Sequence, residues 1–236
     1  MIRWLALGVV LCGCPIVVPP QAEEANALCA QLLTGGDLAG AETACDHALE
    51  YQPKYWDALH NKGLIAMQRG DRAAAKKLFI EALRTNQNMK ASQNALGGLA
   101  MEDGDLDGAV NHFLAALHID PRYIEARRNL GAALLKQTDY VKAEKAFRQF
   151  ILVDGNVVEA WLGFGVALNA QGKRDDAAQA FEKATLLDVG DTRSWFLRGL
   201  NELERERLEE AKDCFERCLL ADEKNLECQK RLDRLR

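Results

Sequence analysis

The stretch Arg127–Phe147, RRNLGAALLKQTDYVKAEKAF, carries the pattern that decides the fold. Its small residue Gly131 and its Ala143/Phe147 pair return every 34 residues along most of the chain. The small residues are Cys29, Gly63, Gly97, Gly131, Gly165 and Gly199, and the pairs are Ala41/Cys45, Ala75/Phe79, Ala109/Phe113, Ala143/Phe147, Ala177/Phe181 and Ala211/Phe215. A fixed period of this length indicates a stack of repeated supersecondary units.

The period divides the chain into six units without an insertion. They are 22–55, 56–89, 90–123, 124–157, 158–191 and 192–225, and they leave 226–236 as a terminal capping helix. Within one unit the apolar residues follow a helical spacing, first at Leu130 and Leu134 and then at Phe147 and Phe150. Each unit is therefore predicted to be a pair of helices that is stable only when it is stacked on its neighbours.

The recurring small residues and phenylalanines have predicted roles in these pairs. The small residue of the first helix allows the second helix to approach closely. The phenylalanine of the second helix is expected to fill the space against the following unit. Glycines are expected at the turns between the two helices. Those in phase are Gly36, Gly70, Gly104 and Gly172.

The units resemble the tetratricopeptide repeat. The fragments that follow its pattern are Arg127-x-x-Leu130-Gly131-x-x-Leu134 and Trp161-x-x-Phe164-Gly165-x-x-Leu168 in first helices, and Ala143-x-x-x-Phe147 in a second helix. The resemblance implies an all-α fold, a solenoid of six helix-turn-helix repeats with a C-terminal capping helix. It also implies that the first helices line a concave face.

Composition excludes several classes of protein. The 236 residues are 48% hydrophobic, which is too high for a disordered chain. The net charge of −5 argues against a dedicated nucleic-acid binder, because no excess of cations exists to displace counterions from phosphate. No apolar run reaches the roughly 18 residues that span a bilayer.

The N-terminus is predicted to direct export and lipidation. A basic start at Arg3 and an apolar stretch over residues 4–11 are typical of a secretory signal. The following Leu11-Cys12-Gly13-Cys14 resembles a bacterial lipobox, which implies removal of residues 1–13 and acylation of Cys14 (palmitate among the chains). Pro15 follows Cys14 in place of the Asp that retains many lipoproteins in the inner membrane, which favours an anchor in the outer membrane, facing the periplasm. Residues 14–21 are expected to be a lipidated, non-helical tether. An uncleaved anchor and a plain signal peptide are the alternatives.

Motifs for catalysis are missing from the sequence. His47, His60, His112 and His118 have no metal-ligand spacing and are expected on the surface. There is no P-loop, GxSxG or HExxH motif, and the alternating charges of Glu202-Leu-Glu204-Arg-Glu206 are expected to form a solvated helix face. We therefore expect no enzymatic activity, cofactor, metal or small-molecule substrate, although an enzyme of cell-wall turnover remains a third functional class.

Five cysteines follow the lipobox, and two disulfides are predicted among them. Cys29 and Cys45 occupy the glycine and phenylalanine places of one helical hairpin, which brings them level with each other, and export permits disulfides. Cys218 can face Cys228 on the terminal helix, which leaves Cys214 unpaired. The alternative is that all five are free or buried thiols.

The concave face is predicted to bind a partner protein. Asparagine amides there can donate to and accept from a peptide backbone, with apolar side chains beside them. The candidate groove residues are Asn26, His60, Asn61, Leu64, Met67, Asn94, Met101 and Asn129, and Leu33, Leu135 and Leu162 are expected on the same surface. For Leu33, Leu64 and Leu135 the alternative is packing between helices. Primary contact is expected in the first three repeats.

A lipidated N-terminus, a short tether and six repeats resemble the type IV pilus pilotins of the Tgl/PilF/PilW type. That resemblance implies a partner, the secretin subunit, which the protein would help to reach the outer membrane or to assemble into multimers. The alternative is an adaptor for peptidoglycan-processing enzymes or for another cell-envelope complex.

Overall fold

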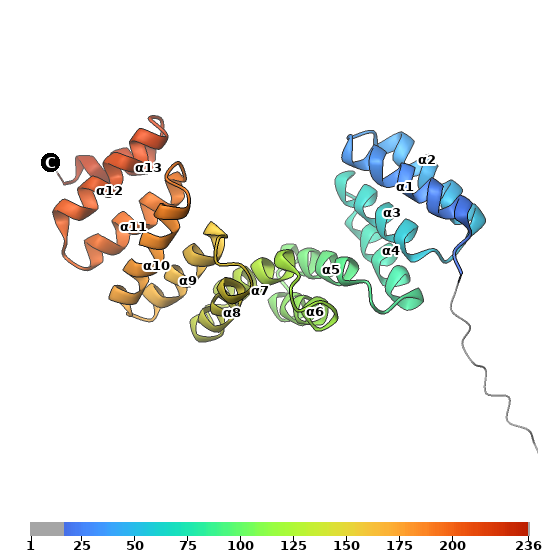
Figure 1. The fold of residues 1–236 in the computed structure, drawn as a ribbon, viewed down its shortest axis with the longest axis horizontal. Helices are drawn as coiled ribbons and strands as arrows, with labels where there is room; N and C mark the ends of the chain where they lie inside the picture. Colours follow the sequence, from blue (N-terminus) through green and yellow to red (C-terminus); the bar gives the residue numbers. More distant parts are fainter. Residues whose placement is uncertain (1–16, 236) are drawn as a thin grey trace, which may run out of the picture. The chain divides into compact units, whose positions relative to one another are not determined.

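The structure is a computed structural model that describes residues 17–235, and this part of the chain is helical without a strand. The expected signal peptide, 1–13, and the lipidation site Cys14 lie outside the described residues. The helices are α1 (Pro20–Thr34), α2 (Leu38–Tyr51), α3 (Trp56–Gln68), α4 (Arg72–Thr85), α5 (Lys90–Glu102), α6 (Leu106–Ile119), α7 (Ile124–Lys136), α8 (Tyr140–Val153), α9 (Val158–Ala170), α10 (Arg174–Leu187), α11 (Thr192–Glu204), α12 (Leu208–Ala221) and α13 (Leu226–Asp233) (Figure 1).

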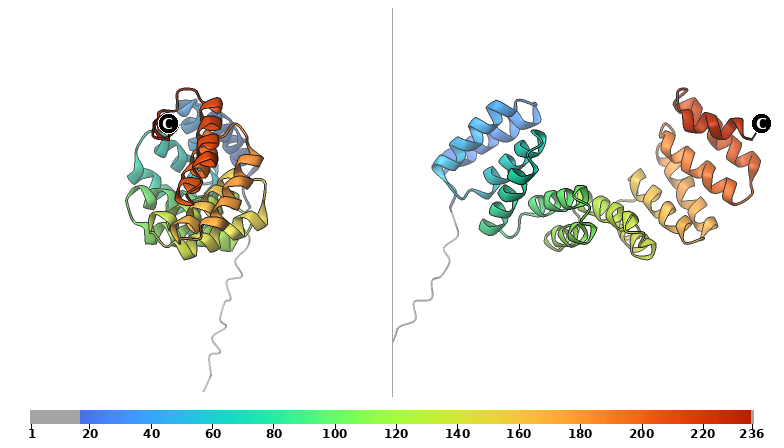
Figure 2. Two further views of the ribbon diagram at one scale, coloured as in Figure 1. Left: turned by 90° about the vertical axis from the view of Figure 1, so that its left-hand side faces the viewer. Right: turned by 180° about the vertical axis from the view of Figure 1, so that it is seen from behind.

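The chain divides into two compact units. The first runs to Thr85 and contains α1–α4, and the second begins at Asn86 and contains α5–α13. Consecutive helices form hairpins in both units, as the side views in Figure 2 show. The all-α solenoid of paired helices with a short terminal helix, predicted from the period, is therefore confirmed.

Three-residue turns close the hairpins, and the middle residue of each turn has a left-handed backbone conformation, with positive φ. Gly36, Gly70, Gly104 and Gly172 have φ between 76° and 83°, which confirms their predicted role. The same place in the fourth and sixth repeats is held by Thr138 (φ 58°) and Glu206 (φ 62°). An aspartate often follows and caps the second helix, as where Asp37 accepts a hydrogen bond from the Gly40 amide at 3.0 Å.

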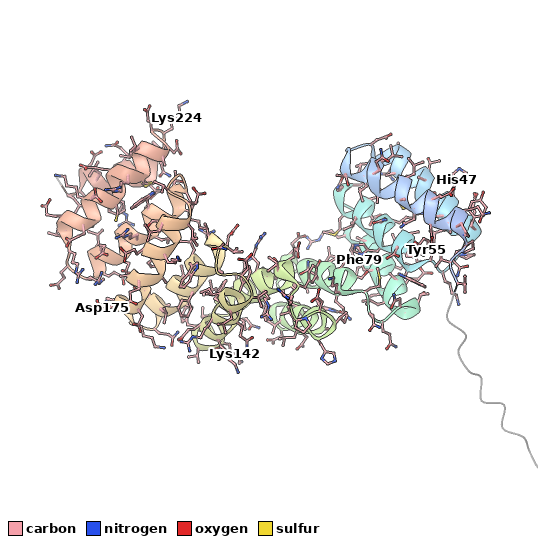
Figure 3. All side chains as sticks on the ribbon, in the orientation of Figure 1. His47, Tyr55, Phe79, Lys142, Asp175 and Lys224 are labelled. Carbon is pink, nitrogen blue, oxygen red and sulfur yellow. A yellow bond between two sulfur atoms is a disulfide. The ribbon has the colours of Figure 1, made fainter. Side chains whose placement is uncertain are left out.

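The phenylalanines pack on the glycines of their own hairpins. A Cβ placed on Gly97 would lie 2.5 Å from a ring carbon of Phe113, and Gly63 has the same relation to Phe79. Phe79, on α4, is labelled in Figure 3. The expectation that each ring mainly fills space against the following unit was incomplete. Phe147 shows both contacts, because it lies against Gly131 of its own hairpin and Gly163 of the next one.

Polar links join successive hairpins at their turns. A residue at the end of a first helix reaches back to a carboxylate on the preceding second helix. The pairs are Arg69–Glu42 at 2.6 Å, Gln137–Asp107 at 2.7 Å, Gln171–Glu144 at 2.9 Å and Arg205–Asp175 at 2.8 Å. First helices also contact the first helix of the next hairpin, α1 with α3, and α5, α7, α9 and α11 in succession, so that they form the inner layer of each stack.

The predicted non-helical tether is too long by two residues, because α1 begins at Pro20. A proline is tolerated in the first helical turn, where its missing N–H would have no partner within the helix. Each helix that the structure describes is too short or too polar to cross a bilayer.

Candidate partner-binding surfaces

The predicted groove residues of the first unit lie on α1 and α3. Asn61 Nδ2 donates to Asn26 Oδ1 at 2.9 Å, so the two amides are fixed relative to each other. Leu64 is half-buried and packs beside the cluster around Cys29, whereas Leu33 is buried within that cluster. Met67 is half-buried near the end of α3. The packing alternative is therefore the better description of Leu33, and Leu64 is shared between core and surface.

His60 is not the surface histidine that the sequence suggested. Its ring centroid lies 5.3 Å from that of Phe79, and the side chain is half-buried. Burial lowers the pKa of His60 to about 4, because the charged imidazolium would lose its hydration. His112 is also half-buried, and its Nδ1 lies 2.8 Å from Gln93 Oε1. Both rings thus contribute to packing between helices.

The second unit repeats the asparagine arrangement of the first. Asn129 Nδ2 on α7 donates to Asn94 Oδ1 on α5 at 3.0 Å, two repeats after the Asn26–Asn61 pair. The pairing leaves further hydrogen-bonding capacity for a ligand, because a primary amide has two N–H donors and two acceptor lone pairs. Met101 is half-buried against the cluster around Phe113. Leu162, expected on the same surface, is 2% exposed and belongs to the core.

A third asparagine pair was not predicted. Asn201 Nδ2 on α11 donates to Asn169 Oδ1 at 2.9 Å and to the Arg174 carbonyl at 3.1 Å. Asn201 is completely buried, and its Oδ1 has no hydrogen-bond partner. Both residues lie late in their helices, out of phase with the other pairs, so the 34-residue register gave no signal for them.

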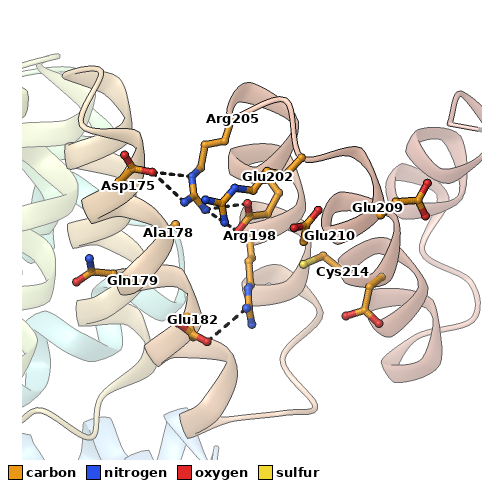
Figure 4. A pocket seen from close by; sticks show the side chains of 12 residues that line it. Asp175, Ala178, Gln179, Glu182, Arg198, Glu202, Arg205, Glu209, Glu210 and Cys214 are labelled. Carbon is orange, nitrogen blue, oxygen red and sulfur yellow. Dashed lines mark hydrogen bonds and ion pairs between the residues drawn. The ribbon is translucent and has the colours of Figure 1, made fainter.

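A hollow between α10, α11 and α12 has a volume of about 840 Å³ (Figure 4). Glu202 and Arg205 form its floor, with both Glu202 oxygens within 2.9 Å of Arg205 Nη1. Glu202 is only 5% exposed, so the predicted solvated face was wrong at this position. Burial of this carboxylate is compensated by the guanidinium one turn later, which also binds Asp175.

Disulfides join both predicted pairs. The Cα atoms of Cys29 and Cys45 are 5.2 Å apart across the α1–α2 hairpin, and Cys218 on α12 is bonded to Cys228 on α13. Cys214 is a free, buried thiol on the wall of the 840 Å³ hollow. Burial raises its pKa to about 11, so the thiol is protonated and unreactive at neutral pH.

The described residues contain no cluster of three or more His, Cys, Asp or Glu side chains suited to a metal ion.

Comparisons with known proteins agree with this architecture. Tetratricopeptide-repeat family models match residues 57–89, 99–137, 128–185 and 165–219. A search of curated proteins found no significant match. A solved structure from the functional characterization of Pseudomonas aeruginosa PilF matches with a TM-score of 0.76 and a sequence identity of 19%. The match covers 89% of this chain and 96% of that one.

Two further solved structures share the fold. YrrB, described as a TPR protein with an unusual peptide-binding site, is 18% identical with a TM-score of 0.67, over 79% of this chain and 96% of its own. MamA from Desulfovibrio magneticus RS-1 is 20% identical with a TM-score of 0.66, over 72% and 96%. At these identities the likeness concerns the fold. Together with the family models and the paired helices, it identifies the chain as a tetratricopeptide-repeat protein.

Proposed function

We propose that the chain is a lipid-anchored, protein-binding component of the bacterial cell envelope that acts as a type IV pilus pilotin. In this role it holds a secretin subunit and assists its targeting to, or multimer assembly in, the outer membrane. The observation that carries the proposal is the match to 96% of the solved PilF chain. The lipobox-like Leu11-Cys12-Gly13-Cys14 ahead of the repeats supports it.

The repeats supply the binding surface in this proposal, and no catalytic step is required. Two asparagine pairs, Asn26–Asn61 and Asn94–Asn129, link neighbouring first helices, with half-buried apolar side chains such as Leu64 and Met101 close by. Such a surface suits a peptide segment, because the amides fix the register of its backbone and the apolar side chains provide contact area. An adaptor for peptidoglycan-processing enzymes or another envelope complex is the second candidate, supported by the same fold in YrrB and MamA.

Complementation in cells tests the pilotin role. A strain that lacks the chain should lose heat-resistant secretin multimers, and the wild-type chain should restore them. Cys14→Ala should remove the anchor and shift the folded protein out of the outer-membrane fraction. Full assembly of the secretin without this chain would refute the pilotin role and leave the adaptor role.

The predicted groove is tested by Met67→Asp. A carboxylate there should weaken binding of an apolar partner by about 2 kcal/mol, because the charge must lose water in the complex. The circular dichroism and melting temperature of the variant are measured beside secretin assembly. A folded Met67→Asp protein that supports full assembly would place the contact elsewhere, and an unfolded variant would show that Met67 is a packing residue.

A further inference from the structure

A second hollow, between α8, α9 and α10, has two aromatic side chains in its floor. Its volume is about 510 Å³, and the floor consists of Trp161, Phe164 and Leu168 from one face of α9. Trp161 Nε1 donates to the Gly155 carbonyl at 2.8 Å, so the polar group of the indole is already satisfied. What remains of the floor offers contact to an apolar side chain.

The equivalent hollows have no aromatic side chain in their lining. One repeat later, Arg198 and Glu202 take the places of Phe164 and Leu168 in the 840 Å³ hollow. Three repeats earlier, in the first unit, Lys62 and Ala66 take them in a hollow of about 360 Å³, which is lined by aliphatic and charged side chains. The aromatic floor is therefore a local property of this place in the stack and not a requirement of the repeat.

The rim of this hollow carries one more cation than carboxylates. Arg148, Lys173 and Lys183 line it against two carboxylates, Glu144 and Asp176. Arg148 and Lys173 share Glu144, at 2.6 and 2.7 Å, and the Arg148 guanidinium also lies 5.6 Å from the centroid of the Phe164 ring. The larger hollow is lined instead by three arginines and six carboxylates. A cationic rim in a chain with a net charge of −5 indicates an acidic ligand.

Two exposed leucines lie on α8 and α10, one helical turn beyond cations of the rim. Leu152 is 81% exposed and lies one helical turn after Arg148, and Leu186 is 69% exposed and lies one turn after Lys183. A concave site of this size suits an inserted side chain better than a flat lipid surface.

We propose that the hollow between α8, α9 and α10 is a docking site for an acidic segment of a partner protein that inserts an aromatic or large aliphatic side chain between Arg148 and Lys183. The inference goes beyond the pilotin role, because it requires only that the chain binds proteins. It also lies on a different surface from the predicted asparagine-lined groove.

The test is binding of a synthetic peptide to the purified full-length chain in detergent. The probe is a fluorescein-labelled peptide with Phe-Leu between two Glu-Asp-Glu segments, followed by fluorescence anisotropy at two salt concentrations. Arg148→Glu/Lys183→Glu should bind it about tenfold more weakly or worse, because attraction at the rim becomes repulsion. The matched control is Arg193→Glu/Lys224→Glu, which reverses the same charge on residues that do not line the hollow and should bind as the wild type does.

Further arms separate this site from simple ionic attraction. A peptide with Ser-Ser in place of Phe-Leu should bind about tenfold more weakly, since the apolar anchor is lost. A perturbation of tryptophan emission by the unlabelled probe should disappear in Trp161→Phe. Melting curves must show that each variant is folded.

Three results would overturn the inference: no binding of the probe, equal effects of the two double variants, or equal binding of the Ser-Ser peptide. Anionic phosphatidylglycerol vesicles that bind with the same dependence on Arg148 and Lys183, in place of the peptide, would assign the site to a membrane surface. A chain that binds the probe but does not support secretin assembly would retain this site and reject the pilotin role.

Discussion

Cys29 and Cys45 are bonded to each other at the two places where each of the five later repeats packs a phenylalanine ring on a glycine. In those repeats the ring lies so close that a Cβ on the glycine would be 2.4–2.7 Å from it. The first repeat replaces this packing with a covalent bond between the same two helices. Since a terminal repeat lacks one neighbour, a covalent link offsets part of the stacking energy that it cannot obtain.

The first prediction concerns this disulfide. Replacing Cys29 and Cys45 with alanine should cost about 3 kcal/mol, the value that loop closure gives for a link over 16 residues. Because the first repeat is terminal, the loss should be local, and amide hydrogen exchange in α1 and α2 should accelerate more than that in α9 and α10. Cys214→Ala, which removes a thiol without a link, is the control. Unchanged protection of α1 and α2 would contradict the stapling role.

Two adjacent glycines on α5 give the second prediction. Gly97→Ala places a methyl group 2.5 Å from the Phe113 ring, whereas Gly98→Ala meets no atom within 4 Å. The first change should destabilise the chain by about 1–3 kcal/mol through overpacking. The second should stabilise it by about 0.5–1 kcal/mol, because alanine loses less backbone entropy in a helix. Urea unfolding of both variants measures the difference, and equal stabilities would show that α5 and α6 can separate freely.

The third prediction concerns the two turns without glycine. Thr138 and Glu206 have the left-handed backbone that glycine has in the other described turns, and a Cβ there costs roughly 1 kcal/mol or more. Thr138→Gly should therefore raise the free energy of unfolding by up to about 1 kcal/mol, with part of the gain offset by greater freedom of the unfolded chain. The reverse change, Gly104→Thr, should lower it. A destabilised Thr138→Gly protein would mean that the threonine side chain has a stabilising contact larger than its strain.

Features that depend on the 34-residue period could be predicted from the sequence. The paired helices, the turn glycines and the Cys29–Cys45 link all follow from residues in the same place of every repeat. Features that depend on one particular neighbour could not. Burial of Glu202 depends on Arg205 as its partner, and it occurs at a place where other repeats have leucine or alanine.

The candidate site shows the same limit. Asparagines on the first helices were recognisable, but their pairing depends on which side chains face each other from successive helices, as with Asn26 and Asn61. The apolar floor of the 510 Å³ hollow was assigned to repeat packing, because Trp161 and Phe164 also match the repeat pattern. A residue that satisfies a packing pattern gives no separate signal for the part of its surface that stays accessible.

The last prediction is a pH dependence that originates at His60. Burial against Phe79 lowers the pKa of His60 in the folded chain to about 4, whereas an unfolded histidine titrates near 6.5. Between these values the unfolded chain takes up a proton that the folded chain does not, so the stability from this residue is complete above pH 6.5 and is lost as the pH falls toward 4. The loss has an upper limit of about 3 kcal/mol.

Two measurements test this account of His60. The imidazole signal in an NMR titration of the folded chain should move with a midpoint near pH 4. The free energy of urea unfolding should fall more steeply between pH 6.5 and pH 4.5 for the wild type than for His60→Gln, which has no imidazole at position 60 to protonate. His118→Gln, which removes an exposed histidine, is the matched control for the loss of one titratable group. Parallel pH profiles for the wild type and His60→Gln would mean that the ring is hydrated in the folded chain, because only a desolvated imidazole resists protonation across this range.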